Sequence, residues 1–171
     1  YLTPYQYDET GGLVLQVEHA RALPASTWNT AGYAAPVATT PQSSPGSAIG
    51  YDRETAYRYD RKNQKIAETR VNVEYTQDTG AAGGTPVLTR MVGDLTTTYG
   101  YDGVGNMVST TDPGGATTYV YYDALGRVSA AVEPARTVEG VGAPVMPLTE
   151  YKVDVFGNVV KEIGYARGAA S

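Results

Sequence analysis

Short runs of alternating apolar and polar residues, separated by turn-forming residues, dominate the pattern along the chain. The segments 106–111 and 116–122 alternate in this way, and they are rich in the threonine, valine and tyrosine that favour strands. Helical periodicity is scarce, since its best example, Val17–Ala25, is short and contains Pro24. The pattern therefore predicts an all-β chain.

One motif recurs along the chain: a tyrosine pair, an aspartate, and a glycine three residues after the aspartate. The clear copies are Tyr5, Tyr7, Asp8 and Gly11; Tyr57, Tyr59, Asp60 and Asn63; Tyr99, Tyr101, Asp102 and Gly105; and Tyr121, Tyr122, Asp123 and Gly126. A weaker copy is Tyr151, Asp154 and Gly157, and a degenerate one is Tyr75 and Asp78. Asp102 and Asp123 are 21 residues apart, whereas Asp78 slips by three from this spacing.

Each copy is typical of a β-hairpin. Alternation places the two rings of Tyr-x-Tyr on one face of a strand. The aspartate starts a turn by accepting hydrogen bonds from backbone amides, and the glycine supplies a residue with positive φ. Asn63, which stands in place of that glycine, tolerates the same conformation. We therefore expect stacked antiparallel hairpins that form a curved sheet, with their tyrosines in ladders.

The spacing of the copies divides the chain into repeats and insertions. The expected parts are a first hairpin (1–20), a Pro/Ser/Thr-rich insertion (21–50), a repeat sheet (51–130), a Pro/Gly-rich insertion (131–150), and a last hairpin with a tail (151–171). We expect the first insertion to be the most protease-sensitive part of the chain.

Composition and charge exclude several classes of function. The chain of 171 residues has 15 tyrosines, a formal net charge of -5 and a pI near 4.8, so it lacks the basic face of a nucleic-acid-binding protein. No apolar run approaches the roughly 18 residues of a membrane span. Without cysteine and with one histidine, His19, thiolate metal sites are impossible and general bases are few. Because residue 1 is tyrosine, we expect a segment of a longer protein.

The repeated units resemble the YD repeats of the Rhs family, which includes bacterial polymorphic toxins, the B and C components of insecticidal toxin complexes, and teneurins. The resemblance covers most of residues 1–17 and 51–165 and is best at 99–128. It implies a β-sheet that spirals into a hollow shell, secreted from bacteria, around a toxin domain. It also implies partners, namely the remaining repeats of a parent shell and an enclosed toxin cargo.

Three other interpretations remain beside this one. Exposed tyrosines can stack against sugars, which makes a carbohydrate- or surface-binding module the main alternative. The aspartates could bind calcium, but no Asp-x-Asp-x-Asp run is present, and turn capping explains their spacing. Asp112-Pro113 resembles an autoproteolytic motif of the family, yet it also fits a simple Pro-Gly turn.

The favoured hypothesis is a non-enzymatic structural segment with no catalytic residues, cofactor or metal. Its two sheet edges would be open when the segment is isolated, so we also expect self-association.

Overall fold

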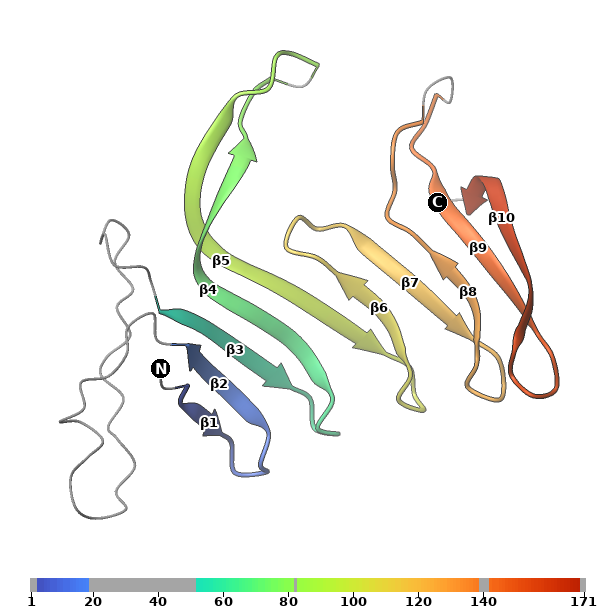
Figure 1. Ribbon diagram of the computed structural model, residues 1–171, viewed down its shortest axis with the longest axis horizontal. Coiled ribbons are helices and arrows are strands. Elements are labelled where there is room, and N and C mark those ends of the chain that lie inside the picture. Colours follow the sequence, from blue (N-terminus) through green and yellow to red (C-terminus); the bar gives the residue numbers. More distant parts are fainter. Residues whose placement is uncertain (1–2, 19–51, 82, 139–141, 170–171) are drawn as a thin grey trace. The chain divides into compact units, whose positions relative to one another are not determined.

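The computed structural model describes residues 3–18, 52–81, 83–138 and 142–169. Within these residues the chain forms strands and no helix, which confirms the all-β prediction. The strands are β1 (Tyr5–Tyr7), β2 (Leu13–Glu18), β3 (Arg53–Tyr59), β4 (Lys65–Asp78), β5 (Leu88–Tyr101), β6 (Met107–Thr111), β7 (Thr117–Tyr122), β8 (Val128–Val132), β9 (Met146–Val153) and β10 (Val159–Ala169) (Figure 1).

The strands follow one another in chain order, so each strand is hydrogen-bonded to its neighbours in sequence. The registers that the structure describes are all antiparallel, as expected for stacked hairpins. The chain divides into two compact units, Tyr1–Thr96 and Thr97–Ser171. The division falls inside β5, and nothing in the sequence pattern indicates it.

Five hairpins, formed by β1–β2, β3–β4, β5–β6, β7–β8 and β9–β10, share one irregularity. In each, the second strand has one extra residue close to the turn; for example, Tyr101 pairs with Met107 whereas Gly100 pairs with Ser109. The same shift occurs in the other four. A bulge of this kind increases the local twist and redirects side chains. The β6–β7 register has no such shift.

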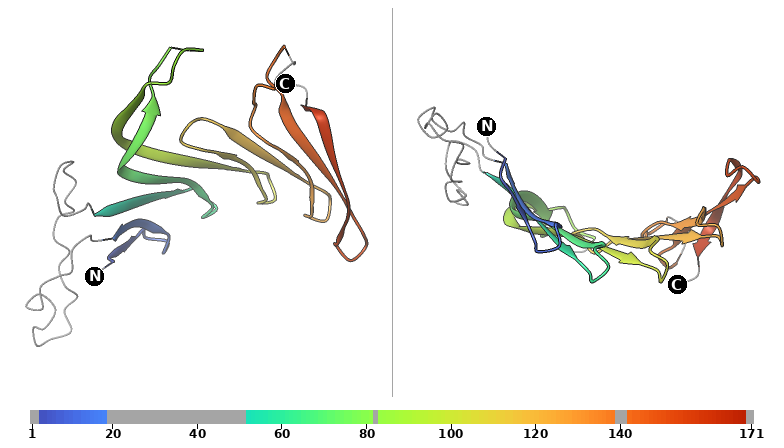
Figure 2. Two further views of the ribbon diagram at one scale, coloured as in Figure 1. Left: turned by 45° about the horizontal axis from the view of Figure 1, so that its top comes forward. Right: turned by 90° about the horizontal axis from the view of Figure 1, so that it is seen from below.

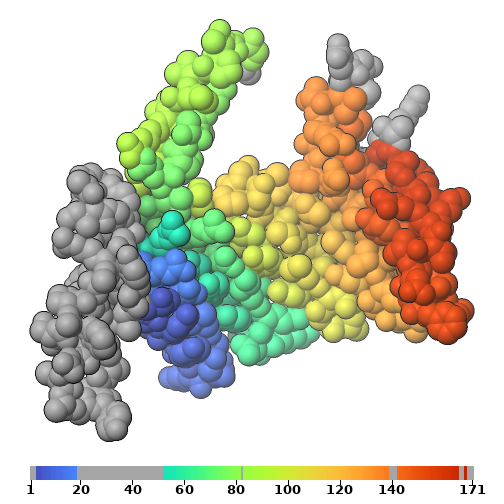
Figure 3. Space-filling view, viewed as in Figure 1, coloured from blue at the N-terminus to red at the C-terminus, as the bar shows by residue number. Residues whose placement is uncertain are grey.

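In the first unit, β4 and β5 continue as a two-stranded arm beyond the end of β3 (Figures 1 and 3). The pairing of β3 with β4 stops at Val71. The next residue, Asn72, has a φ of 52°, and its N–H donates to Asp94 Oδ1 at 2.9 Å. Asparagine is one of the few residues that adopt this left-handed conformation readily, so Asn72 lies where β4 leaves β3.

The sheet has very little core. Among the described residues, the buried apolar side chains are Val17, Ala67 and Val132, each at most 5% exposed. No second layer of strands or helices covers the described part of either unit (Figure 2). Cross-strand threonine pairs contribute instead, with hydroxyl oxygens 2.9 Å apart in Thr69–Thr96 and Thr111–Thr117.

The two expected insertions have different outcomes. The first, 21–50, lies outside the described residues, as does His19. The second, expected over 131–150, is shorter in the structure, because β8 continues to Val132 and β9 begins at Met146. Between them Arg136 and Val145 form an isolated antiparallel bridge. The prolines at 134, 144 and 147 indicate a loop, but Pro147 is the second residue of β9, where a strand tolerates proline.

Candidate functional site: the aspartate turns and the notch between two of them

The turns that follow β1, β3, β5, β7 and β9 have one geometry. The N–H of the aspartate donates to the carbonyl four residues later at 2.8–3.0 Å, and the N–H three residues later donates to the aspartate carbonyl at 3.0–3.2 Å. The aspartate Oδ1 also accepts the N–H groups of the second and fourth following residues; in the turn of Asp123 these distances are 2.9 and 3.0 Å. Each carboxylate therefore satisfies amides that the turn would otherwise leave unpaired.

The third residue after each aspartate has positive φ. It is glycine in four of the turns, with φ of 74° at Gly126, and Asn63 in the fifth, with φ of 60°. The repeat motif of the sequence thus corresponds to one recurring turn: Asp8, Asp60, Asp102, Asp123 and Asp154 each begin it. Since these turns follow alternate strands, they lie at the same end of the strands within each unit.

Two aspartates close loops at the opposite end of the strands. Asp78 Oδ1 accepts the N–H groups of Gly80 and Val87, both at 2.9 Å, across a longer loop between β4 and β5. The copy at Tyr75 and Asp78 is therefore not a further member of the series, which explains its slipped spacing. The ring of Tyr75 instead lies beside Gly93 of β5.

Asp112 forms a sixth turn, at the position where the sequence predicts a Pro-Gly turn outside the tyrosine repeats. Its Oδ1 accepts the N–H groups of Gly114 at 2.8 Å and Ala116 at 2.9 Å, and Gly115 has a φ of 86°. The signal was the Asp-x-x-Gly spacing without preceding tyrosines. The autoproteolytic interpretation of Asp112-Pro113 gains no support, because the carboxylate has the same role as in the other turns.

The tyrosines of the second unit divide between the two faces of the sheet. Tyr99, Tyr101, Tyr122 and Tyr151 share one face, and Tyr119, Tyr121 and Tyr165 share the other, according to the strand registers. Tyr121 and Tyr122, which the motif grouped together, therefore point in opposite directions. Alternation requires this of adjacent strand residues, so Val120 rather than Tyr121 is the partner of Tyr122 on its face.

Arg127 connects two neighbouring turns of the second unit. Its Nε and Nη2 lie 2.7 Å from Asp123 Oδ2, and its Nη1 donates to the carbonyl oxygen of Asp154 at 2.9 Å. Arg127 is the fourth residue after its aspartate. The residue at the same position in the preceding turn is Asn106, whose Nδ2 donates to its own Asp102 Oδ2 at 2.9 Å.

Hydrogen bonds lower the pKa of several of these carboxyl groups. The side chain of Arg127 is the main cause for Asp123, that of Asn106 for Asp102, that of Asn158 for Asp154, and that of Thr10 for Asp8. Turn amides contribute in all four cases. Because these groups stabilise the charged form, the ionised carboxylates stabilise the turns.

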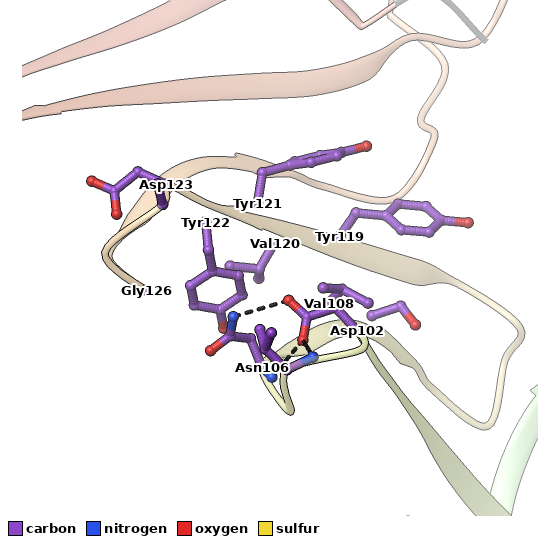
Figure 4. Close-up of a pocket in the computed structure, with 12 residues that line it drawn as sticks. Asp102, Asn106, Val108, Tyr119, Val120, Tyr121, Tyr122, Asp123 and Gly126 are labelled. Carbon is purple, nitrogen blue, oxygen red and sulfur yellow. Dashed lines mark hydrogen bonds between the residues drawn. The ribbon is translucent and has the colours of Figure 1, made fainter.

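A cavity of about 810 Å³, which we call the notch, lies between the turns of Asp102 and Asp123 (Figure 4). It exists because the β6–β7 register covers only residues 109–111 of β6, so Met107 and Val108 are unpaired with β7 there. The Tyr122 hydroxyl donates to the Met107 carbonyl at 3.0 Å and spans the gap. Asp102, Asn106, Val108, Tyr122 and Asp123 are among the residues that line it.

The described residues offer little for other chemistry. They contain no group of three or more histidine, cysteine, aspartate or glutamate side chains placed to hold a metal ion. Over the same residues, no helix has the length and apolar character needed to cross a membrane.

The fold and its turns define a protein built from repeated β-hairpins, each closed by an aspartate. The family model of the RHS repeat matches residues 92–117 and 101–138. This match, within residues 92–138, confirms the resemblance to the Rhs family seen in the sequence. No curated protein matches the chain. The RHS repeat is a structural repeat, and it occurs in extracellular or cell-surface proteins.

The positive φ of the turn glycines predicts the effect of Gly126→Ala. A Cβ at Gly126 would meet nothing within 4 Å, so the only penalty is the left-handed backbone. We expect a loss of about 1–2 kcal/mol in the free energy of unfolding, measured by urea denaturation. Gly103→Ala is the control, because Gly103 is equally open and lacks positive φ. Equal effects of the two substitutions would contradict this account.

The lowered pKa values of Asp8, Asp102, Asp123 and Asp154 predict acid sensitivity. Their contribution to stability is complete above the ordinary aspartate value of 3.8 and is lost as the pH falls through the lower folded values. We expect the thermal midpoint to fall steeply below that pH. Asp123→Asn should flatten this decline, because the substitution removes one titrating group. An unchanged decline in the variant would assign the acid sensitivity elsewhere.

Proposed function

We propose that the chain is a non-enzymatic wall segment of a secreted bacterial RHS-repeat protein, which separates an enclosed toxin or effector polypeptide from solvent. The observation that carries the proposal is the single-layer sheet with almost no core of its own. Globular domains normally bury the apolar side of a sheet against a second layer. A sheet that leaves both faces accessible is suited to stand between two compartments.

The construction of the sheet supports the same role. Each hairpin is closed by its own aspartate, and each is paired to the next along the chain, so a sheet can be extended by adding hairpins. At the ends of the series, β1 and β10 each have one strand neighbour among the described residues. Such edges pair readily with further strands, here those of the remaining repeats of a parent protein.

The open edges predict that the isolated chain self-associates. Sedimentation velocity should show concentration-dependent species larger than a monomer, and Val160→Lys on β10 should reduce them, because charge on an edge strand opposes pairing. Val155→Lys is the matched control, since Val155 is 89% exposed in a turn rather than on a strand edge.

A protease-resistant monomer at every concentration would contradict the proposal that this sheet is one part of a larger wall. Equal effects of Val160→Lys and Val155→Lys would mean that association does not use the edge at β10.

One observation favours a second candidate, the binding of saccharides. Tyr119 and Tyr121 lie two residues apart on one face of β7 and are 39% and 54% exposed. Exposed aromatic rings can stack against the apolar face of a sugar. If the chain binds glycans, Tyr121→Ala should weaken binding on a glycan array, whereas Tyr122→Phe, on the opposite face, should not. The absence of any bound glycan would remove this candidate.

A further inference from the structure

Two neighbouring aspartate turns of the second unit differ in the residue four positions after the aspartate. The fourth residue after Asp123 is Arg127, whose guanidinium lies between its own Asp123 carboxylate and the carbonyl oxygen of Asp154 in the next turn. The fourth residue after Asp102 is Asn106, which is too short to span the gap and bonds its own Asp102. The first gap is therefore filled by the chain itself, and the second is the notch.

The notch presents the groups that hold the guanidinium in the filled gap. Asp102 supplies a carboxylate on one side, as Asp123 does for Arg127. Asp123 supplies a turn carbonyl on the other side, which accepts from Gly126 as the Asp154 carbonyl accepts from Gly157. The ring of Tyr122 points from β7 toward Asn106 between them (Figure 4). Its aromatic face adds a surface on which a planar cation can stack.

We propose that the notch binds the guanidinium of an arginine side chain from another polypeptide segment, at the position that Arg127 occupies in the neighbouring gap. Arginine fits better than lysine, because its planar fork can donate to a carboxylate and a carbonyl at once, as Arg127 does. A metal ion fits poorly, since Asp102 Oδ1 already accepts from the amides of Val104, Gly105 and Asn106.

This inference does not depend on the wall function. It requires only the turn geometry of the second unit, so a chain that fails to self-associate would still bind the arginine side chain, and the two proposals fail separately.

The direct test is a titration of the isotopically labelled full-length chain with acetyl-Ala-Arg-Ala-amide, followed by NMR. We expect saturable shifts of the Asn106 side-chain amide and of the backbone amides of Tyr122 and Asp123. The matching peptide with citrulline, which is neutral and of the same shape, should bind at least about tenfold more weakly, because the charge-assisted bonds are lost. No shifts around the notch with the arginine peptide would overturn the proposal.

Asn106→Arg tests the equivalence of the two gaps. The new side chain should occupy the notch, raise the thermal midpoint and weaken binding of the arginine peptide at least about tenfold. Asn158→Arg is the matched control: it stands at the same position of the last turn, and no further turn follows it in the described chain, so neither quantity should change. Unchanged peptide affinity in Asn106→Arg would overturn the proposal.

Arg127→Asn provides a second test, in which a side chain is made smaller rather than larger as in Asn106→Arg. It should empty the filled gap and create a second site, seen as additional peptide-induced shifts of the backbone amides of Asp154 and Val155. If the Asn106→Arg chain does not fold, this variant alone decides, because shifts confined to the original notch would show that the two gaps are not equivalent.

Discussion

The structure depends on a carboxylate that replaces water for the backbone amides of a tight turn. A hairpin of this kind has too small an apolar surface to stabilise itself, so the stability of its turn matters more than in a domain with a large core. The carboxylate makes the turn a rigid local unit with a fixed number of residues, and fixed turns fix the register of both strands. In a sheet with three buried apolar side chains among its described residues, that local rigidity substitutes for packing.

The turns also determine how neighbouring hairpins meet. Each aspartate hairpin has a bulge next to its turn. In the second unit, neighbouring hairpins pair only through the parts of their strands that lie away from the aspartate turns. Near the aspartate turns, neighbouring hairpins are joined by side chains. Arg127 joins the turns of Asp123 and Asp154, whereas between the turns of Asp102 and Asp123 the Tyr122 hydroxyl makes one hydrogen bond to the Met107 carbonyl. One of these gaps holds a structural contact and the other holds a cavity, and the residue four positions after the aspartate differs between them, Arg127 in one and Asn106 in the other.

Much of the fold could be predicted from the sequence because its determinants are local. The Asp-x-x-Gly spacing specifies the turn, and the alternation on either side specifies strands, so the all-β fold follows from short segments such as 99–106. The features that could not be predicted depend on pairing between segments. The bulges and the arm that begins at Asn72 follow only once strand partners are known. The turn at Asp112 was predicted as a Pro-Gly turn, but without preceding tyrosines its likeness to the repeat turns could not be seen in the sequence.

The two ends of the strands differ in how much variation they allow. At the end with the aspartate turns, each connection within a unit has the same length, because the hydrogen bonds of the turn admit no extra residue. At the other end, the connections within the second unit differ in length, with five residues in 112–116 and thirteen in 133–145. Insertions and deletions can thus accumulate along one rim while the opposite rim keeps its spacing. A lineage of such proteins could acquire new surface loops on that rim without ever disturbing the alignment of its strands.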